Sequence, residues 1–423
     1  MNNKKWMAIL LGGIMAASLA APCSVSAAEK TTLTFWHAMG GTNGEVLQQI
    51  VDDFNASQDE IEIKAEYQGT YDDTITKLKA AMQSDSGLPD VCQMYDVGTK
   101  FMYDSGAVIP VEDKFESTGY DKSSVMEVIS SYYTVDGKQY AMPFNVSTPM
   151  LYYNKDVFEA AGLDPETPPT TYDEVLEDAK KIVESGAAPV GYSQAIYGWF
   201  FEQQLAGLGV TYGNNDNGRK EAVTAVDFDS NGGGLKVFDM WKKLYDSGYF
   251  EDYGTTTADT QTAFFSGQVG MIIESTAILK NAVDSSPFEV GTGYLPRIEQ
   301  NDEGGVIIGG GSLWLTDTGN EANEDAAWKF IEYITTPDVQ AKWSMGTGYF
   351  AINEKAYETE DMKAYLKENP NFETAINQLK DSPVNCNTAG VLSGVQTEAR
   401  LTFNEIMPQV YDGKLTTQDA VDQ

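Results

Sequence analysis

The sequence predicts an α/β fold with mostly parallel sheets flanked by helices, and three observations support this prediction. Thr31–His37 and Ile61–Gln68 have the patterns of strands, and a helical pattern lies between them. This order favours parallel strands joined by right-handed crossovers. A chain of 423 residues is too long for one ordinary domain. Because no low-complexity linker interrupts it, lobes joined by several crossing strands are favoured over domains in series.

The remaining elements follow from local patterns. Asn43 is the candidate N-cap of the first helix, whose apolar residues recur at helical spacing. A second helix and a short strand, Asp90–Tyr95, complete the first alternation. Val306–Leu315 has the pattern of a strand interrupted by glycines. Further helices are predicted over Asp156–Ala161, Tyr172–Ser185, Gly234–Ser247, Glu321–Thr335 and Thr417–Val421.

The N-terminal segment predicts export. Lys4 and Lys5 precede an apolar stretch, Met7–Ala21, and the small residues Val25–Ala28 form a cleavage site. Residues 1–28 are therefore interpreted as a signal peptide. Lipid anchoring through Cys23 is the alternative, although Pro22 stands where a small residue is expected before a lipidated cysteine.

Charge and cysteine content narrow the function further. The formal net charge of −35 excludes nucleic acid and anionic membrane surfaces as partners, and it repels anionic ligands at long range. After signal removal, Cys92 and Cys386 remain. They are interpreted as two separate buried thiols, with pairing in an oxidising compartment left open.

Open α/β sheets bind ligands at the carboxyl ends of their strands, so the residues just after strands are the candidates for a binding site. His37, the single histidine, lies at such an end. It is interpreted as a packed histidine, because nothing nearby completes a catalytic triad. No Cys/His cluster indicates zinc, and the loop at Asn214–Gly218 fails as a calcium loop. The segments to consider are 37–41, 68–71, 95–98, 145–148, 274–276 and 309–312.

Arg400 is the first candidate for a ligand contact. The chain has three arginines, and Arg219 and Arg297 lie in stretches that predict exposure. Arg400 instead follows Ala399 in a helical pattern that indicates partial burial. The alternative is an ordinary salt bridge on the helix surface with Glu398 or Glu405.

The stretch Phe144–Thr171 carries a family resemblance. It reads FNVSTPMLYYNKDVFEAAGLDPETPPTT, and TGYFAIN at Tyr349 is a second shared motif. Here the chain resembles the extracellular solute-binding proteins of ABC importers, and within them the glycerol-3-phosphate-binding branch. The resemblance implies no catalysis, no cofactor, a monomer outside the cytoplasmic membrane (periplasm or cell-envelope exterior), and delivery of the ligand to ABC permease subunits.

The same resemblance implies a two-lobed fold and a ligand site. The lobes are expected at 29–143 with 290–347, and at 144–289 with 348–423. Arg400 is expected to grip the phosphate, because a guanidinium fork matches it bidentately. Asp96, where the family has Glu, is placed on the glycerol hydroxyls. The full set of expected ligand-binding residues is Tyr71, Asp96, Ser147, Ser275, Gly310, Tyr349 and Arg400.

Each residue also has a structural alternative. Gly310 sits where glycine permits positive φ, which also fits a plain bulge. Ser275 suits an N-cap, Ser147 suits a turn, and the tyrosines suit a core. For function, the alternatives are a neutral sugar or a glycerophosphodiester as ligand and, remotely, a secreted glycoside hydrolase with paired carboxylates.

Overall fold

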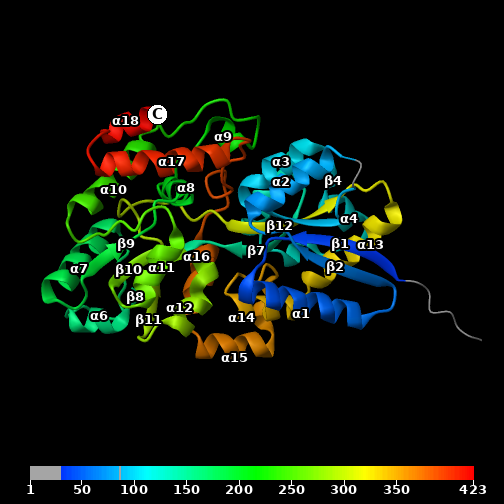
Figure 1. Cartoon of the computed structure of the whole chain (residues 1–423), viewed down its shortest axis with the longest axis horizontal. Coiled ribbons are helices and arrows are strands. Elements are labelled where there is room, and N and C mark those ends of the chain that lie inside the picture. The colour runs from blue at the N-terminus through cyan, green and yellow to red at the C-terminus, as the bar shows by residue number, and fades with distance from the viewer. Residues whose placement is uncertain (1–29, 85–86) are drawn as a thin grey trace, which may run out of the picture.

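The computed structural model describes residues 30–84 and 87–423, so the expected signal peptide and Cys23 lie outside the described residues. Two lobes lie side by side, each built around its own sheet and covered by helices (Figure 1). The fold class expected from the sequence is therefore confirmed: an α/β protein with two lobes.

The first sheet combines a parallel part with antiparallel additions. β1 pairs in parallel with β2 and with β3, as the alternation predicts. β12, from late in the chain, lies antiparallel to β3, β4 and β7. The bounds in spatial order are β2 (Ile61–Tyr67), β1 (Thr31–His37), β3 (Val91–Tyr95), β12 (Gly309–Thr316) and β4 (Val108–Ile109), with β7 (Met142–Ser147) beside β12.

The second sheet has four strands and belongs to the other lobe. β10 runs parallel to β9 and antiparallel to β8, which also pairs with β11. Every residue of β8 is buried, because helices and loops cover both faces of this sheet. The bounds in spatial order are β11 (Val290–Gly293), β8 (Pro149–Asn154), β10 (Val269–Ser275) and β9 (Val190–Ser193), and β5 (Thr134–Val135) with β6 (Lys138–Gln139) forms a separate hairpin.

The helices follow the predicted ranges closely. In the first half of the chain they are α1 (Gly41–Ser57), α2 (Tyr71–Met82), α3 (Thr99–Ser105), α4 (Val111–Thr118), α5 (Glu127–Ser130), α6 (Lys155–Ala160), α7 (Tyr172–Ser185), α8 (Gly198–Gly207) and α9 (Asn214–Gly218). In the second half they are α10 (Gly233–Asp246), α11 (Thr257–Phe265), α12 (Leu279–Ser285), α13 (Glu321–Ile334), α14 (Pro337–Thr347), α15 (Glu360–Glu368), α16 (Asn371–Asp381), α17 (Gln396–Tyr411) and α18 (Thr417–Asp422).

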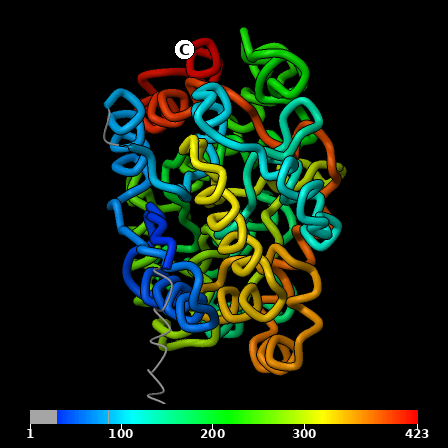
Figure 2. Tube along the Cα trace, turned by 90° about the vertical axis from the view of Figure 1, so that its right-hand side faces the viewer, coloured from blue at the N-terminus to red at the C-terminus, as the bar shows by residue number. Residues whose placement is uncertain are grey.

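Early and late parts of the chain share the first lobe. α1 packs against α13 and α14, which brings the blue and the orange segments together in Figure 2. Two of the crossings exchange strands between the lobes: β7 belongs to the first sheet and the following β8 to the second, while β11 belongs to the second and β12 to the first. This pattern fits a discontinuous plan, and the exact lobe bounds remain a prediction. The observed crossings fall a few residues later than expected, because all of β7 and Tyr349 lie with the first sheet and β11 lies with the second.

The crossing from β7 to β8 is a single residue, Thr148, fixed on several sides. The Thr276 amide donates to the Thr148 carbonyl over 2.8 Å, and the Thr148 amide donates to the Thr276 hydroxyl over 3.2 Å. From α16, the side-chain amide of Gln378 donates to the carbonyl of Pro149 over 2.7 Å. Residues that adjoin this crossing are therefore held in register on both lobes.

One local expectation is wrong. Asn43 does not cap α1, because the helix begins at Gly41 and its N-cap is Gly40. Gly41 takes a φ of 54°, which residues other than glycine adopt only with strain. The helix can therefore start at Gly41, two residues before Asn43. Asn43 consequently lies inside the first turn.

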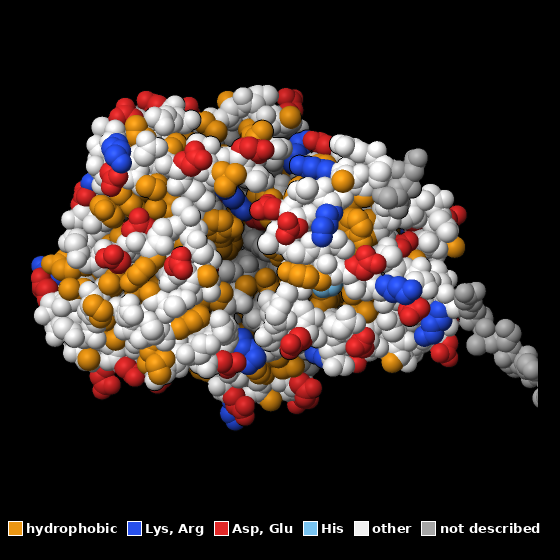
Figure 3. Space-filling model, in the orientation of Figure 1, with side chains coloured by type: hydrophobic (Ala, Val, Ile, Leu, Met, Phe, Trp, Pro, Cys, Tyr) orange, Lys and Arg blue, Asp and Glu red, His pale blue; other side chains and the backbone are white. Residues whose placement is uncertain are grey.

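A hollow opens between the two lobes (Figure 3). Acidic side chains are spread over the visible face, in keeping with the net charge of −35. Within residues 30–84 and 87–423, no helix is both long enough and apolar enough to span a bilayer.

Candidate ligand-binding cleft between the lobes

Arg400 joins the two lobes. It lies on α17, is 8% exposed, and donates through Nη2 to Oδ2 of Asp96 over 2.7 Å. Asp96 follows β3 of the first lobe, at the carboxyl end of a parallel strand. Arg400 also donates through Nε and Nη2 to the two oxygens of Glu202 on α8, over 2.7 and 2.8 Å. The expected alternative, a surface salt bridge with Glu398 or Glu405, is wrong.

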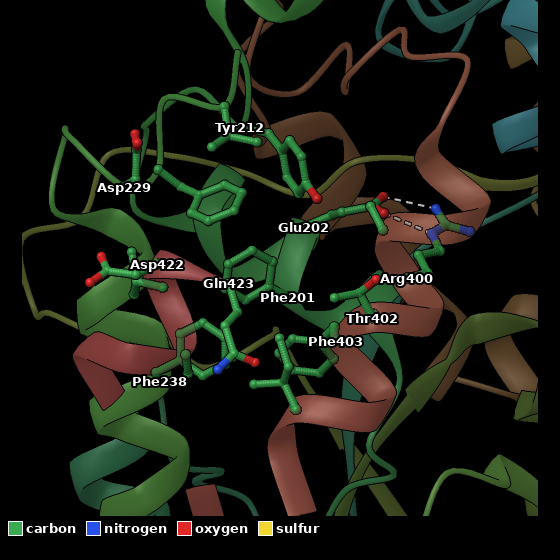
Figure 4. Close-up of a pocket in the computed structure, with 17 residues that line it drawn as sticks. Phe201, Glu202, Tyr212, Asp229, Phe238, Arg400, Thr402, Phe403, Asp422 and Gln423 are labelled. Atoms are coloured by element: carbon green, nitrogen blue, oxygen red, sulfur yellow. Dashed lines mark hydrogen bonds and ion pairs between the residues drawn. The ribbon is translucent and has the colours of Figure 1, made fainter. Parts of the chain in front are cut away.

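The approach of α8 to α17 depends on glycine. A Cβ on Gly198 would lie 2.5 Å from the Cα of Arg400, so only glycine lets the two helices come this close. The Gly198 amide donates to the side chain of Asn404 over 3.0 Å, which fixes the contact. One turn further along α8, Glu202 then meets the Arg400 guanidinium. Figure 4 shows this pair at the edge of the aromatic side chains.

Glu202 is a site residue that the sequence prediction missed. It is 5% exposed in a helix whose other residues are almost all buried. The side-chain amide of Gln396 also donates to Glu202 Oε1, over 2.6 Å. The available signal was a single charge in the apolar run GWFFEQQLAG, since a buried carboxylate requires a partner.

The charges of this triad do not cancel. Burial alone would lower the pKa of Arg400, but the nearby carboxylates of Asp96 and Glu202 outweigh it and raise that pKa above its ordinary value. One guanidinium faces two carboxylates, so the triad carries a net negative charge in a buried setting. Most donors of Arg400 already have an acceptor.

Tyr71 and Tyr349 lie together on the first-lobe side. The Asn145 side-chain amide donates to the Tyr71 hydroxyl over 2.6 Å. Burial raises the pKa of Tyr349, and hydrogen bonds with Asn145 and Tyr71 partly offset that rise. Tyr71 stacks on Tyr95, with ring centroids 5.2 Å apart. Burial, followed by the neighbouring Tyr349, raises the pKa of Tyr71, so both phenols are neutral donors.

Ser147, Gly310 and Ser275 gather at the crossing strands. Ser147 ends β7 opposite Gly309, and Gly310 pairs with Val146. Ser275 ends β10 opposite Pro149, two positions beyond Ser147. The structure therefore brings these residues into one region with Tyr71, Asp96, Tyr349 and Arg400, linked by the contacts above. Their contact with a ligand remains a prediction.

Two of these residues also have sufficient structural reasons. Gly310 has a φ of 90°, and a Cβ there would lie 1.9 Å from the carbonyl oxygen of Asn145. The strand pairing also shifts register between Gly311 and Ser312, as expected for a bulge. The Ser275 hydroxyl accepts from the Ala277 amide over 3.2 Å, so it caps the short 3₁₀ turn that follows.

Aromatic side chains lie near the triad from the second lobe. Trp199 is 5% exposed and packs on the backbone of Gly309, where a Cβ would lie 2.6 Å from its ring. Its Nε1 has no hydrogen-bond partner within the described residues. Burial raises the pKa of the Tyr197 phenol, while the charge of Arg400 lowers that pKa and the charge of Asp96 raises it. By contrast, Trp36 on β1 of the first lobe donates to Glu66 on the adjacent strand.

A second cavity lies on the second lobe, behind the Glu202–Arg400 pair (Figure 4). Its volume is about 570 Å³. The residues that line it from the aromatic side are Phe201, Tyr212, Phe228, Phe238 and Phe403, and α18 with Gln423 borders it. Glu202 and Arg400 also line it, whereas none of the ligand-binding residues expected from the first lobe does. The cavity therefore adjoins the triad from the second-lobe side.

The remaining expectations have clear outcomes. His37 is packed, as predicted: its Nδ1 accepts from the Met39 amide over 3.3 Å, and burial lowers its pKa to about 4. Cys92 and Cys386 are both free thiols, the first buried and the second partly so. Among the residues that the structure describes, no group of His, Cys, Asp and Glu is arranged to hold a metal.

Two α/β lobes with a cleft between them are the architecture of the two-lobed proteins that close around a ligand. Residues 49–374 match the family described as bacterial extracellular solute-binding protein. The chain therefore belongs to this family.

Among its relatives, the chain is 31% identical over 399 residues to the sn-glycerol-3-phosphate-binding periplasmic protein UgpB of Escherichia coli (strain K12), covering 93% of this chain and 90% of the relative. It is also 31% identical over 406 residues to UgpB of Yersinia pseudotuberculosis, covering 94% and 92%.

Solved structures share the fold. The cyclic alpha-maltosyl-1,6-maltose binding protein from Arthrobacter globiformis is 25% identical with a TM-score of 0.77, covering 93% of this chain and 96% of that one. UgpB from Mycobacterium tuberculosis, in complex with glycerophosphocholine, is 20% identical with a TM-score of 0.79 over the same shares.

Proposed function

We propose that this protein is the substrate-binding component of an ABC importer and that it captures sn-glycerol-3-phosphate or a glycerophosphodiester. The observation that carries the proposal is the buried Arg400, which faces Asp96 across the lobe interface at 2.7 Å. A relative of 31% identity over nearly the whole chain is named for binding sn-glycerol-3-phosphate, which supports the same ligand here.

The proposed mechanism is lobe closure around the ligand. Tyr71, Asp96 and Tyr349 belong to the first-lobe side, whereas Ser275 and Arg400 belong to the second. A ligand that bonds to both sides stabilises the closed state by its differential affinity for that state. The permease of the importer then recognises the closed form. The protein performs no chemical step in this scheme.

Each group has a distinct part in recognition. The hydroxyls of Tyr71, Tyr349, Ser147 and Ser275 are neutral donors, which add little net charge around an anion. The guanidinium of Arg400 supplies the bidentate fork. Asp96 accepts from glycerol hydroxyls, because a carboxylate repels a phosphate but binds hydroxyl protons well.

Arg400 must exchange partners for a phosphate to bind. Most of its donors are engaged by Asp96 and Glu202, so a phosphate that is held bidentately has to replace at least one of these contacts. The displaced carboxylate can turn to the hydroxyl groups of the same ligand. Binding of a phosphate is thus coupled to rearrangement of the triad.

A neutral saccharide is the second candidate, and one observation favours it. Arg400 is already compensated by two buried carboxylates, an arrangement that suits a ligand rich in hydroxyl groups and free of charge. The buried Trp199 near the triad adds an apolar surface for a sugar ring.

Thermal melting with a ligand panel tests the proposal. A ligand that binds only the folded state raises the melting temperature by mass action. We expect sn-glycerol-3-phosphate or glycerophosphocholine to do so at millimolar concentrations and maltose not to. Protection by maltose alone would replace the proposed ligand with a sugar. Repeated turnover of chromogenic glycosides would instead indicate a hydrolase.

A further inference from the structure

Arg219 is held where the two lobes meet, contrary to its expected exposure. Its side chain is partly buried, and its guanidinium donates only to backbone carbonyls. Nη1 donates to the carbonyl of Tyr132 over 2.8 Å, while Nη2 donates to the carbonyl of Gly390 over 3.0 Å and to that of Ala389. Tyr132 belongs to the segment before β5, on the first-lobe side, and Gly390 lies in the loop that leads to α17.

No carboxylate pairs with Arg219 within the described part of the chain. Burial lowers its pKa to about 10, which still leaves the guanidinium charged at neutral pH. Hydrogen bonds from a charged donor are stronger than neutral ones, so these carbonyl contacts are a firm connection. An arginine used only for solubility would point its charge to water instead.

The turn that presents Arg219 has an unusual backbone. Asn215, Asp216 and Asn217 have φ values of 57°, 54° and 58°, in the left-handed region. The Asn217 side chain accepts from the amides of Tyr212 and Gly213 over 2.8 and 2.9 Å, which stabilises this conformation. A strained conformation persists only where its surroundings determine it, so the placement of Arg219 is specified rather than incidental.

Tyr132 lies directly beside this connection. The Arg219 guanidinium sits 5.3 Å from the centre of the Tyr132 ring, and a Cβ on Gly390 would come within 2.8 Å of the same ring. The ring is 4% exposed, and no hydrogen bond of its hydroxyl is found within the described residues.

The Tyr132 phenol also lies within the field of the triad. Burial raises its pKa, the charge of Asp96 raises it further, and the charge of Arg400 lowers it. The groups that act on this hydroxyl from all sides are thus Asp96, Glu202, Arg400 and Arg219. The Cβ that would meet the Tyr132 ring from Gly390 would also lie 2.9 Å from Ile307, whose amide donates to the side chain of Gln203, the neighbour of Glu202 on α8. These contacts place the phenol near the triad. A neutral phenol with a free hydroxyl in this position is suited to donate to a ligand there.

We propose that Tyr132 is a further ligand-contacting residue and that Arg219 is its positioning residue, tying the segment of Tyr132 to the loop before α17. This inference rests on the proposed function in that it uses the same ligand and cleft. It adds a donor outside the set that the family resemblance implies, and it explains why a buried arginine binds carbonyls at the lobe boundary.

A double-mutant cycle tests the proposal. The dissociation constant of sn-glycerol-3-phosphate is measured by calorimetry for the parent, Tyr132→Phe, Arg219→Ala and the double variant. We expect Tyr132→Phe to weaken binding about tenfold, the scale of one hydrogen bond to a charged group, with an unchanged melting temperature. Arg219→Ala weakens binding to a similar extent, and the double variant is no weaker than Arg219→Ala alone.

Controls separate positioning from general damage. Arg297→Ala removes an exposed arginine and leaves binding unchanged, while Arg219→Lys, which keeps the charge but not the planar fork, falls between parent and Arg219→Ala. The proposal is overturned if Tyr132→Phe binds the ligand as tightly as the parent. It is also overturned if the losses of affinity in the two single variants multiply in the double variant.

A ligand-free measurement keeps the two proposals distinguishable. Hydrogen exchange over residues 126–140 should speed up in Arg219→Ala and not in Arg297→Ala. Unchanged exchange overturns the positioning role whatever the ligand is. If the parent does not bind sn-glycerol-3-phosphate, the proposed function fails. The binding cycle is then run with maltose, where the same outcomes support or overturn the role of Tyr132.

Discussion

Arg400 Nη2 and Asp96 Oδ2 lie 2.7 Å apart, and this ion pair connects the two lobes. The same guanidinium is held from behind by Glu202 on its own lobe, also at 2.7 Å. The cleft is therefore bridged by a cation with an anion on either side. Under the proposed function, ligand recognition and lobe closure would depend on how these three groups change partners when a ligand enters.

Glu202→Gln should raise the affinity for a charged ligand and leave the affinity for a neutral ligand unchanged. The substitution keeps the shape of the side chain but removes a buried negative charge beside Arg400. We expect sn-glycerol-3-phosphate to bind about tenfold tighter or more, since one unit charge at this range is worth more than about 1.4 kcal/mol. A neutral sugar should gain nothing from the change.

Calorimetry with both ligands measures this effect. Glu398→Gln, an exposed substitution on α17, is the matched control and should change neither affinity. Weaker phosphate binding by Glu202→Gln would contradict the view that this carboxylate competes with the ligand for Arg400.

Arg400→Lys should lose affinity although it keeps the charge. A lysine ammonium cannot reproduce the fork that contacts Glu202 through two nitrogens. The expected result is a clear rise in the dissociation constant of sn-glycerol-3-phosphate with a circular dichroism spectrum like that of the parent. Equal affinity in the two proteins would show that only the charge at this position matters.

Glu274 should make stability depend on pH. It is 4% exposed, and burial raises its pKa to about 7, although the side chain of Gln261 and the amide of Ser275 donate to it. A raised pKa means that the folded state binds the proton more tightly than the unfolded state. This contribution to stability is therefore present below the ordinary pKa of glutamate and is lost as the pH rises towards 7.

The difference in the free energy of unfolding between Glu274→Gln and the parent should thus be about 2–3 kcal/mol more favourable to the variant at pH 8 than at pH 5. Denaturant titrations at both pH values measure the difference, with the exposed Glu251→Gln as control. A variant whose stability tracks the parent at both pH values would exclude a buried titrating group here.

Gly310→Ala should be much more destabilising than a comparable glycine elsewhere. Gly310 and Gly319 both have positive φ, 90° and 69°, but only Gly310 lacks room, since its Cβ would lie 1.9 Å from a backbone oxygen. Gly319→Ala isolates the cost of the φ value, on the order of 1–2 kcal/mol. We expect a larger fall in melting temperature for Gly310→Ala, and equal falls would contradict the packing of β12 against β7.

The sequence predicted local structure well where periodicity was strong. The strand Thr31–His37 and the helix Tyr172–Ser185 have the predicted bounds, because burial on one side dictates their apolar pattern. The capping role of Asn43 was wrong, since Gly41 starts the helix first. The N-cap rules used for the prediction do not cover a helix that begins at a glycine with positive φ.

The site was predicted only in part, for physical reasons. Arg400 was a candidate from its helical pattern, and the family resemblance added Asp96. Their mutual ion pair, however, spans 304 positions of sequence and has no local signature. Glu202 was missed and Arg219 was wrongly expected to be exposed, because the partners of both lie far away in the sequence. The charge of Glu202 is matched from another helix, and Arg219 is held by carbonyls, which any residue type supplies.

The most direct test of the central claim is a calorimetric titration of sn-glycerol-3-phosphate into the parent protein and Arg400→Ala, side by side with Arg297→Ala. The account predicts saturable binding by the parent and by Arg297→Ala. It predicts a loss of roughly 2–5 kcal/mol in binding free energy for Arg400→Ala, the scale for removing one partner of a buried charged pair. Binding by Arg400→Ala as tight as that of the parent would contradict the account.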